Sequence, residues 1–482
     1  MSHQIPHVPT QLFIDGCWVE GADGARIAVM DPAREEIIAH VADASVEDGL
    51  AALSAAHAAG PAWAATAPRA RSEILRRAFD LMVAQRETLA QLITLESGKA
   101  FLEALGEVSY AAEFLRWYAE EAVRISGDVS VAPGGANRIV VVRQPIGVAV
   151  LVTPWNFPAA MATRKIGPAL AAGCTVVLKP AKETPLTALA MAEIFAQAGV
   201  PNGVVNVVPS TRSAAMVRAL LHDPRVRKLS FTGSTEVGRH LLSEASDQIV
   251  KCSMELGGNA PFIVFADADL DHAVESAMVA KLRNGGESCT AANRFLVERP
   301  VAEAFGRKLA HAMSEVTLGH GLDAGVKLGP LVDAKTRRKV AELVDEALAC
   351  GASLLCGGRA PERTGFFYEP TVLADVPPHA RVMREEIFGP VAPIGVFDGE
   401  DEAVARANDT SLGLVSFVHT RDLARAMRVA ERIESGMVGI NRGIVSDPAA
   451  PFGGWKQSGL GREGGHDGIL EYLESKYICV AW

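Results

Sequence analysis

The chain has 482 residues, of which 49% are hydrophobic and 22% are charged, as is typical of a globular protein with large cores. Its 47 basic and 57 acidic residues give a net charge of −10, which argues against a nucleic-acid partner and disfavours a membrane-surface role. The longest apolar runs are shorter than the roughly 20 residues that a membrane span needs. No secretory pattern opens the chain, and its seven cysteines include no C-x-x-C pair. We therefore expect a reduced, cytoplasmic protein of two or three domains without a metal site.

Short strands separated by turns are predicted near the N-terminus, in LFIDGCWVE and IAVMDPAREEIIAHV. Residues 46–121 are rich in Ala and repeat apolar side chains three and four positions apart, which predicts helices. The PGG at 133–135 interrupts this pattern. The following RIVVVRQP (138–145) is rich in β-branched residues and is predicted to be a strand.

From 146 to 265 the chain alternates regularly between apolar strands and helices, beginning with GVAVLVTP and continuing through QIVKCSMEL. This alternation predicts a parallel sheet covered by helices, with ligands at the carboxyl ends of the strands. A second α/β section follows Gly257 and Gly258, with RFLVE, APIGVF and LVSFVHT among its strands. The last residues, LEYLESKYICVAW, predict a helix end and a strand, and a terminal strand is often a pairing edge for another subunit.

One cysteine stands out because it follows a glycine pair, in RNGGESCTAANR. The helix before Cys289 is predicted to end at Gly285 and Gly286, whose backbone lets a ligand approach closely. Backbone N–H groups there would favour a thiolate and any oxyanion formed when the thiol attacks a substrate. A small buried thiol accounts for the same residues equally well. This stretch alone leaves both interpretations open.

Two further polar residues stand where strands are predicted to end. Glu255, in MELGGN, is a candidate general base, because partial burial would bring its pKa towards neutral. Asn156, in PWNFP, is a candidate oxyanion donor, because two prolines fix its backbone. The structural alternatives are capping or ion pairing for Glu255 and a simple turn for Asn156. For Glu255, the residues alone favour the structural alternative.

A cofactor site is indicated by VVLKPAKETP and FTGSTEVG. Lys179 ends a buried strand and is well placed for a ribose or a phosphate. Gly233 and Ser234 open a helix whose backbone N–H groups suit a pyrophosphate. The dinucleotide fingerprint G-x-G-x-x-G is absent, so this signal is weak by itself.

Seven motifs occur together in the order and spacing of the NAD(P)-dependent aldehyde dehydrogenase superfamily: PWNFP, KPAKETP, FTGSTEVG, MELGGN, GGESC, EEIFGPV and PFGGWKQSGLGRE. The chain resembles this family over essentially its whole length. The resemblance implies an α/β fold with a Rossmann-like cofactor domain (1–121 and 142–257) and a second α/β catalytic domain (258–455). It also implies a small β oligomerisation element (122–141 and 466–482), and hence a homodimer or homotetramer.

The resemblance also implies roles for single residues. Cys289 corresponds to the nucleophile, Glu255 to the base that activates water, and Asn156, with the backbone N–H of Cys289, to the oxyanion site. The implied reaction is attack of the thiolate on an aldehyde, hydride transfer to a nicotinamide, and hydrolysis of the resulting thioester. The implied cofactor contacts are Thr153, Pro154, Trp155, Lys179, Lys182, Gly233, Ser234, Glu386 and Phe388.

Arg164, Arg283 and Ser446 resemble the carboxylate-binding set of succinate-semialdehyde dehydrogenases. A pair of forked guanidinium groups with a hydroxyl suits a carboxylate at the far end of a short aldehyde. The expected substrate is therefore succinate semialdehyde, and the alternative is another carboxylated aldehyde such as glutarate semialdehyde. Structural ion pairs are the other interpretation of the two arginines.

Three positions depart from common family patterns. Lys182 stands where members that prefer NAD often carry Glu, and a lysine there would attract a 2′-phosphate, which favours NADP or dual use. A solvated loop lysine is the alternative. Glu287 replaces a common Gln two residues before Cys289, and its charge is expected to point away from the thiol. Ala291 stands where some succinate-semialdehyde enzymes carry a second cysteine, so no local disulfide switch is expected.

Two other classes of protein stay open. In a coenzyme-A-dependent acylating enzyme, CoA rather than water would resolve the thioester, but the retained Glu255 favours water. A non-catalytic protein of the same fold would not need Cys289, Glu255 and Asn156 together.

Overall fold

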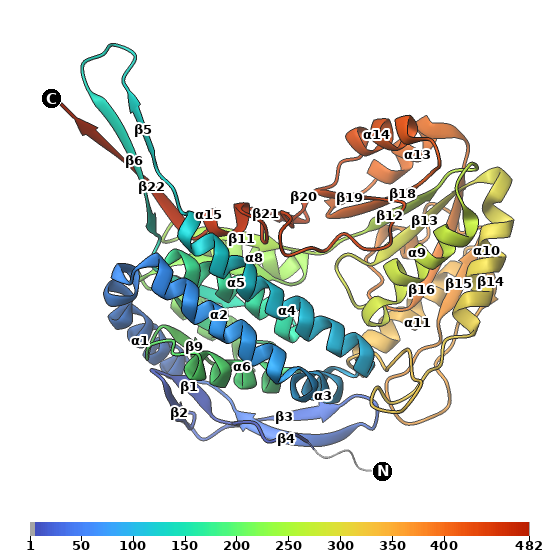
Figure 1. Cartoon of the computed structure of the whole chain (residues 1–482). Helices are drawn as coiled ribbons and strands as arrows, with labels where there is room; N and C mark the ends of the chain where they lie inside the picture. The colour runs from blue at the N-terminus through green and yellow to red at the C-terminus, as the bar shows by residue number, and fades with distance from the viewer. Residues whose placement is uncertain (1–4, 482) are drawn as a thin grey trace.

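The computed structural model describes residues 5–481, and its two largest sheets each form the centre of one α/β body (Figure 1). The first sheet has the strand order β2-β1-β9-β8-β7-β10-β11-β21, and its strands from β9 to β11 are parallel. Its strands are β1 (Leu12–Ile14), β2 (Cys17–Val19), β7 (Val148–Val152), β8 (Thr175–Lys179), β9 (Val205–Val207), β10 (Val226–Thr232), β11 (Lys251–Glu255) and β21 (Gly459–Leu460).

Helices cover both faces of the first sheet because its central strands are apolar on both sides. Ala149 and Leu151 of β7 belong to one buried cluster with α2–α6, whereas Val148 and Val150 belong to another with α1, α7 and α8. The helices are α1 (Val46–Ala65), α2 (Pro68–Ala84), α3 (Arg86–Ser97), α4 (Phe101–Glu121), α5 (Pro158–Ala172), α6 (Pro185–Gln197), α7 (Ser213–Leu221) and α8 (Thr235–Ala245). Every residue of α5 is buried, so this helix is a rigid support for whatever lies at its N-terminus.

The second sheet has the order β14-β15-β16-β13-β12-β18-β19 and is again covered on both faces. Its strands are β12 (Ala260–Val264), β13 (Ala292–Glu298), β14 (Ser353–Cys356), β15 (Thr371–Ala374), β16 (Val391–Phe397), β18 (Val415–His419) and β19 (Met437–Ile440). Its helices are α9 (Leu270–Leu282), α10 (Arg299–Ser314), α11 (Ala334–Ala349), α12 (Arg381–Arg384), α13 (Gly399–Asn408) and α14 (Leu423–Arg432).

A third, three-stranded sheet projects away from the first body (Figure 1). It joins β5 (Asp128–Val131) and β6 (Arg138–Pro145) to the C-terminal strand β22 (Leu473–Val480), which follows the short helix α15 (Asp467–Leu470). Strand β6 continues four residues past the expected domain boundary at 141. Two small pairs complete the fold: β3 (Arg26–Asp31) with β4 (Glu36–Ala42), and β17 (Leu412–Gly413) with β20 (Trp455–Lys456).

The predicted α/β class and the predicted parallel sheet are confirmed. One boundary was wrong: the helix before Cys289 ends at Leu282, not at the glycine pair, and a 3-10 turn (Arg283–Gly286) follows it. Asn284 and Gly285 adopt left-handed backbone angles there, which an α-helix does not tolerate. Among residues 5–481, no helix is long and apolar enough to cross a membrane.

Candidate active site

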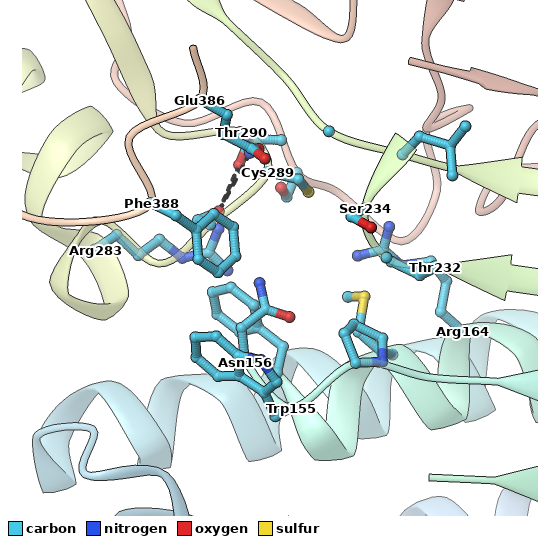
Figure 2. Close-up of a pocket in the computed structure, with 18 of the residues that line it drawn as sticks. Trp155, Asn156, Arg164, Thr232, Ser234, Arg283, Cys289, Thr290, Glu386 and Phe388 are labelled. Atoms are coloured by element: carbon cyan, nitrogen blue, oxygen red, sulfur yellow. Dashed lines mark hydrogen bonds between the residues drawn. The ribbon is translucent and has the colours of Figure 1, made fainter. Parts of the chain in front are cut away.

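A cavity of about 270 Å³ lies at the carboxyl ends of β7, β10 and β11, and loops of the second body close it. Figure 2 shows its side chains around one hollow, with Cys289 and Asn156 projecting towards the centre. The predicted site residues that line it are Pro154, Trp155, Asn156, Arg164, Gly233, Ser234, Arg283, Cys289, Glu386, Phe388 and Ser446.

Four predicted site residues do not line this cavity. Thr153, Lys179 and Glu255 stand at or just after the ends of β7, β8 and β11, and all three are buried. Lys182 is 58% exposed, lies 3.9 Å from the carboxylate of Glu183, and lines a separate cavity of about 500 Å³.

The backbone before Cys289 makes a close approach that only glycine permits. Gly286 has φ of +78°, and a Cβ at this position would lie 2.2 Å from the carbonyl oxygen of Gly389. Burial raises the pKa of the Cys289 thiol to about 12, although the positive charges of Arg164 and Arg283 oppose the shift. Burial thus works against the predicted thiolate in the protein alone, and attack needs an acceptor for the thiol proton.

The side chain of Asn156 is held at the edge of the cavity by main-chain groups. Its Nδ2 donates to the carbonyl of Glu287 (3.0 Å), and the Nδ2 of Asn284 donates to the carbonyls of both Asn156 and Glu287 (2.9 Å each). Since an amide nitrogen carries two hydrogens, the second N–H of Asn156 is left for an oxyanion.

A buried ion pair fixes the backbone of Asn156 from the other side. The ammonium of Lys99 donates to the carboxylate of Glu107 and, at 2.9 Å, to the main-chain carbonyl of Asn156. Glu107 in turn accepts from the backbone N–H of Ala159 at the start of α5 (2.9 Å). The geometry of Asn156 is thus fixed by charge-assisted bonds that link α4, the loop after β7 and α5.

The two arginines have different surroundings. Arg164 is buried on α5, with its guanidinium carbon 4.1 Å from the centre of the Phe452 ring and its Nη1 3.6 Å from Glu463. Arg283 is half-buried, with its guanidinium carbon 4.8 Å from the Phe157 ring. It has no hydrogen bond or ion pair with any residue between 5 and 481. Both positive charges therefore lie in the wall of the cavity that holds Cys289.

Glu255 is buried beside a second carboxylate. Burial raises its pKa well above the ordinary value, and the neighbouring Glu463 raises it further, against the effect of Arg164 and Lys165. Lys165 makes a buried ion pair with Glu463. The Oε2 atom of Glu255 has no hydrogen-bond partner within the described part of the chain. Glu255 is therefore a buried carboxyl group that holds its proton more strongly than an ordinary glutamate and has one oxygen without a partner in the described chain.

The residues implied to bind a nicotinamide cofactor fit that group. Ser234 caps α8 and accepts from the N–H of Val237 (3.3 Å), so the first turn of this helix begins at the cavity. A Cβ at Gly233 would lie 2.5 Å from the Phe231 ring, so a larger residue would clash there. Because glycine has no side chain, its backbone is accessible to a ligand at this point. Burial lowers the pKa of Lys179, at the end of β8, to about 8.

On the opposite wall, the Oε1 atom of Glu386 accepts from the N–H of Gly258 (3.0 Å). The rings of Phe388 and Trp155 meet edge to face, with centroids 5.5 Å apart. Both rings lie in the wall of the cavity that holds Cys289 (Figure 2). Within residues 5–481, no group of three or more His, Cys, Asp or Glu side chains is arranged to hold a metal ion.

Sequence reasoning missed several residues of this site, among them Lys99, Tyr110 and Lys339. Lys99 ends the stretch LESGK, where a lysine after glycine looks like a solvated helix end. Tyr110 lies in an apolar helical repeat and looks like a core aromatic. Lys339 lines the cavity from α11 and donates to the carbonyl of Glu386 (2.7 Å). Spacing along the chain contains no signal that brings these residues to Cys289.

Comparison with known proteins agrees with this geometry. A model described as "Aldehyde dehydrogenase family" matches residues 18–478. The chain is 55% identical over 445 residues to a succinate-semialdehyde dehydrogenase of Paenarthrobacter nicotinovorans, which covers 92% of this chain and 99% of that protein. It is 52% identical both to the NADP(+) succinate-semialdehyde dehydrogenase of Escherichia coli and to a glutarate-semialdehyde dehydrogenase of Pseudomonas aeruginosa, each over 98% of this chain and 97% of the relative.

A crystal structure of an NADP-dependent enzyme from E. coli has the same fold, with a TM-score of 0.97 and 51% identity over 98% of both chains. The match of the family model and the identity to these relatives both extend over nearly the whole chain. The chain belongs to the aldehyde dehydrogenase family.

Proposed function

We propose that this protein oxidises succinate semialdehyde to succinate, with NADP or NAD as hydride acceptor. The observation that supports it best is the position of Arg164 and Arg283, two positive charges in the same cavity as Cys289 and Asn156. In a short aldehyde with a carboxylate at its other end, the aldehyde group can reach Cys289 and Asn156 while the carboxylate pairs with the two arginines. The relatives named above act, by their names, on succinate or glutarate semialdehyde, which are both aldehydes of this kind.

The reaction begins when the Cys289 thiol passes its proton to water and its sulfur bonds to the aldehyde carbon. The carbonyl oxygen becomes an oxyanion, which accepts hydrogen bonds from the second N–H of Asn156 and from the backbone N–H of Cys289. The hydrogen on the former aldehyde carbon then leaves as a hydride, and a thioester of Cys289 remains. The nicotinamide cofactor supplies the acceptor for that hydride when it is bound.

Glu255 serves the second half of the reaction. Its carboxylate takes a proton from a water molecule, which attacks the thioester and releases succinate and the Cys289 thiol. Because the pKa of Glu255 is raised, this step gains rate as the pH rises and the carboxylate forms. Hydrolysis by water distinguishes this proposal from an acylating enzyme, in which CoA would accept the acyl group.

The cofactor would lie between the start of α8 and the Phe388 ring. Gly233 and Ser234 would contact the pyrophosphate, Lys179 a ribose, and Glu386 the nicotinamide ribose. Pro154 and Trp155 would form the cavity wall after β7, and Thr153 would support them from its buried position at the end of that strand. Lys182 favours NADP, since its exposed ammonium can approach a 2′-phosphate.

The domain organisation, the assembly of subunits and the location in the cell belong to the same proposal. The division into a cofactor domain, a catalytic domain and a projecting oligomerisation element is supported by the three separate sheets. We propose a homodimer or homotetramer in the cytoplasm, with the projecting sheet between subunits.

The test is a substrate panel run with NADP and NAD side by side. The kcat/KM should be highest for succinate semialdehyde, lower for glutarate semialdehyde and lowest for butanal, with free acid formed in the absence of CoA. A higher value for glutarate semialdehyde would select the alternative substrate. A higher value for butanal would contradict recognition of a distal carboxylate.

A further inference from the structure

Tyr110 places a phenol in the cavity wall next to both arginines. It lies on α4, lines the cavity, and packs edge to face against Phe114 with centroids 4.9 Å apart. The guanidinium carbon of Arg283 is 5.9 Å from the Tyr110 ring, and that of Arg164 is 5.5 Å from the Phe114 ring. The Tyr110 side chain is therefore part of the arginine-lined end of the cavity.

Two hydrogen-bond donors at this end have no acceptor. The Tyr110 hydroxyl and the Nε of Arg164 are both buried, and neither has a hydrogen-bond partner within residues 5–481. Burial acts to lower the pKa of Arg164, but the surrounding ionisable groups, led by Tyr110 and Glu463, raise it. A buried donor without an acceptor is costly, so such donors in a cavity indicate a ligand that accepts from them.

The hydroxyl has no packing role that would explain it. The contact with Phe114 and the contact with the Arg283 guanidinium both involve the ring, which a phenylalanine would also supply. The oxygen adds only a polar atom to an apolar wall that includes Phe157 and Met161. Its presence is therefore explained by a bound acceptor rather than by the fold.

We propose that the Tyr110 hydroxyl donates a hydrogen bond to the distal carboxylate of the aldehyde substrate and acts as a determinant of specificity. This inference rests on the proposed function and adds a neutral donor to its two guanidinium groups. A carboxylate has lone pairs for the phenol as well as for both arginines. An aldehyde without an anionic end leaves the phenol and the Arg164 Nε unpaired, so the site rejects it.

The experiment compares wild type with Tyr110→Phe on succinate semialdehyde and on butanal, which has the same chain length but no carboxylate. Loss of one hydrogen bond to a charged acceptor should lower kcat/KM for succinate semialdehyde about tenfold or more, mainly through KM. The value for butanal should stay the same or rise. Binding of succinate, measured by calorimetry without turnover, should weaken by a similar factor.

Tyr368→Phe is the matched control. The Tyr368 hydroxyl is likewise buried without a partner in the described chain, but it packs in the core of the second body and does not line the cavity. This variant should keep the wild-type preference for succinate semialdehyde over butanal.

The substrate preferences of wild type and Tyr110→Phe distinguish a failure of the Tyr110 role from a failure of the proposed function. A wild-type preference that survives unchanged in Tyr110→Phe would overturn the role of Tyr110 and leave the proposed function standing. A wild type without any preference for succinate semialdehyde would remove the proposed function and the role of Tyr110 together.

Discussion

At the scale of single residues, Glu287 is a glutamate where many family members have a glutamine. It stands two positions before Cys289. Its Oε1 accepts from the N–H of Val332 (3.0 Å), on a segment that precedes α11. Its main-chain carbonyl accepts from both Asn156 and Asn284. The carboxyl group thus holds the segment at Val332, while the backbone of the same residue orients the oxyanion amide.

Burial raises the pKa of Glu287 well above its ordinary value, with Asp333 raising it further. The folded protein therefore keeps a proton on this group that the unfolded chain loses above about pH 4.3. Stability falls as the pH rises from there towards the raised pKa, by up to about 1.4 kcal/mol for each pH unit. A glutamine retains the acceptor for Val332 and does not titrate.

We expect Glu287→Gln to unfold at a higher temperature than wild type, with a difference that grows between pH 5.5 and pH 8.5. Thermal unfolding of both proteins across this range measures the difference at each pH. Equal differences at all pH values would show that the Glu287 carboxyl does not remain protonated in the fold.

At the scale of elements, the active-site loop after β7 is held in place by the buried ion pair of Lys99 and Glu107, which lie just before and within α4. Lys99 and Glu107 are both almost completely buried, and they connect the start and first half of α4 to Asn156 and to the N-terminus of α5. Removing one member of a buried pair leaves the other charge uncompensated, which costs about 3–5 kcal/mol.

Lys99→Met should therefore lose stability on this scale and also lose kcat, because the backbone of Asn156 is released. The double variant Lys99→Met with Glu107→Gln should recover part of the stability, since the glutamine carries no orphan charge and its oxygen can still accept from Ala159. Denaturant unfolding and kcat of the three proteins measure both effects. A single variant with wild-type stability and kcat would refute this account of the loop.

The elements themselves were predictable from local patterns. The strands β7 and β8 are nearly continuous apolar runs, β10 and β11 mix apolar residues with Lys and Ser, and glycines such as Gly173 end helices between the strands. The 3-10 turn before Cys289 was not predictable in the same way. The left-handed angle of Asn284 there depends on bonds from its amide to Asn156 and Glu287, which lie on other parts of the site.

At the scale of the whole molecule, the cavity gathers side chains from Tyr110 to Phe452. Motif spacing together with the family resemblance was sufficient to name Cys289, Asn156 and both arginines, although Arg164 lies inside α5 and not at its end. It could not name Tyr110, whose position in an apolar helical repeat is the same as that of a core residue. Nor could it show that Glu255 lies behind the cavity wall, since depth depends on how the two bodies pack.

Several apolar side chains of the projecting sheet are exposed in the part of the chain that the structure describes. Val129 and Tyr477 are 69% and 56% exposed. Exposed apolar groups beside an unpaired strand edge suit a second copy of the protein. The double variant Val129→Lys with Val131→Lys should therefore form smaller assemblies than wild type in analytical ultracentrifugation.

The control is Val83→Lys, on α2 of the first body, where the side chain is 49% exposed. It should leave the assembly unchanged. A wild type that sediments as a monomer, or a double variant with the wild-type assembly, would remove the projecting sheet from the subunit interface.

The most direct test of the central claim is the ratio of kcat/KM for succinate semialdehyde to that for butanal, measured in wild type and in Arg283→Met. Arg283 is the cleaner choice of the two arginines, because Arg164 also neutralises the buried Glu463. Loss of its charge from a substrate carboxylate should lower the ratio at least about thirtyfold, with kcat/KM for butanal little changed and the surface control Arg307→Met unaffected. A ratio that is the same in wild type and in Arg283→Met would contradict the claim that this cavity selects an aldehyde by its distant carboxylate.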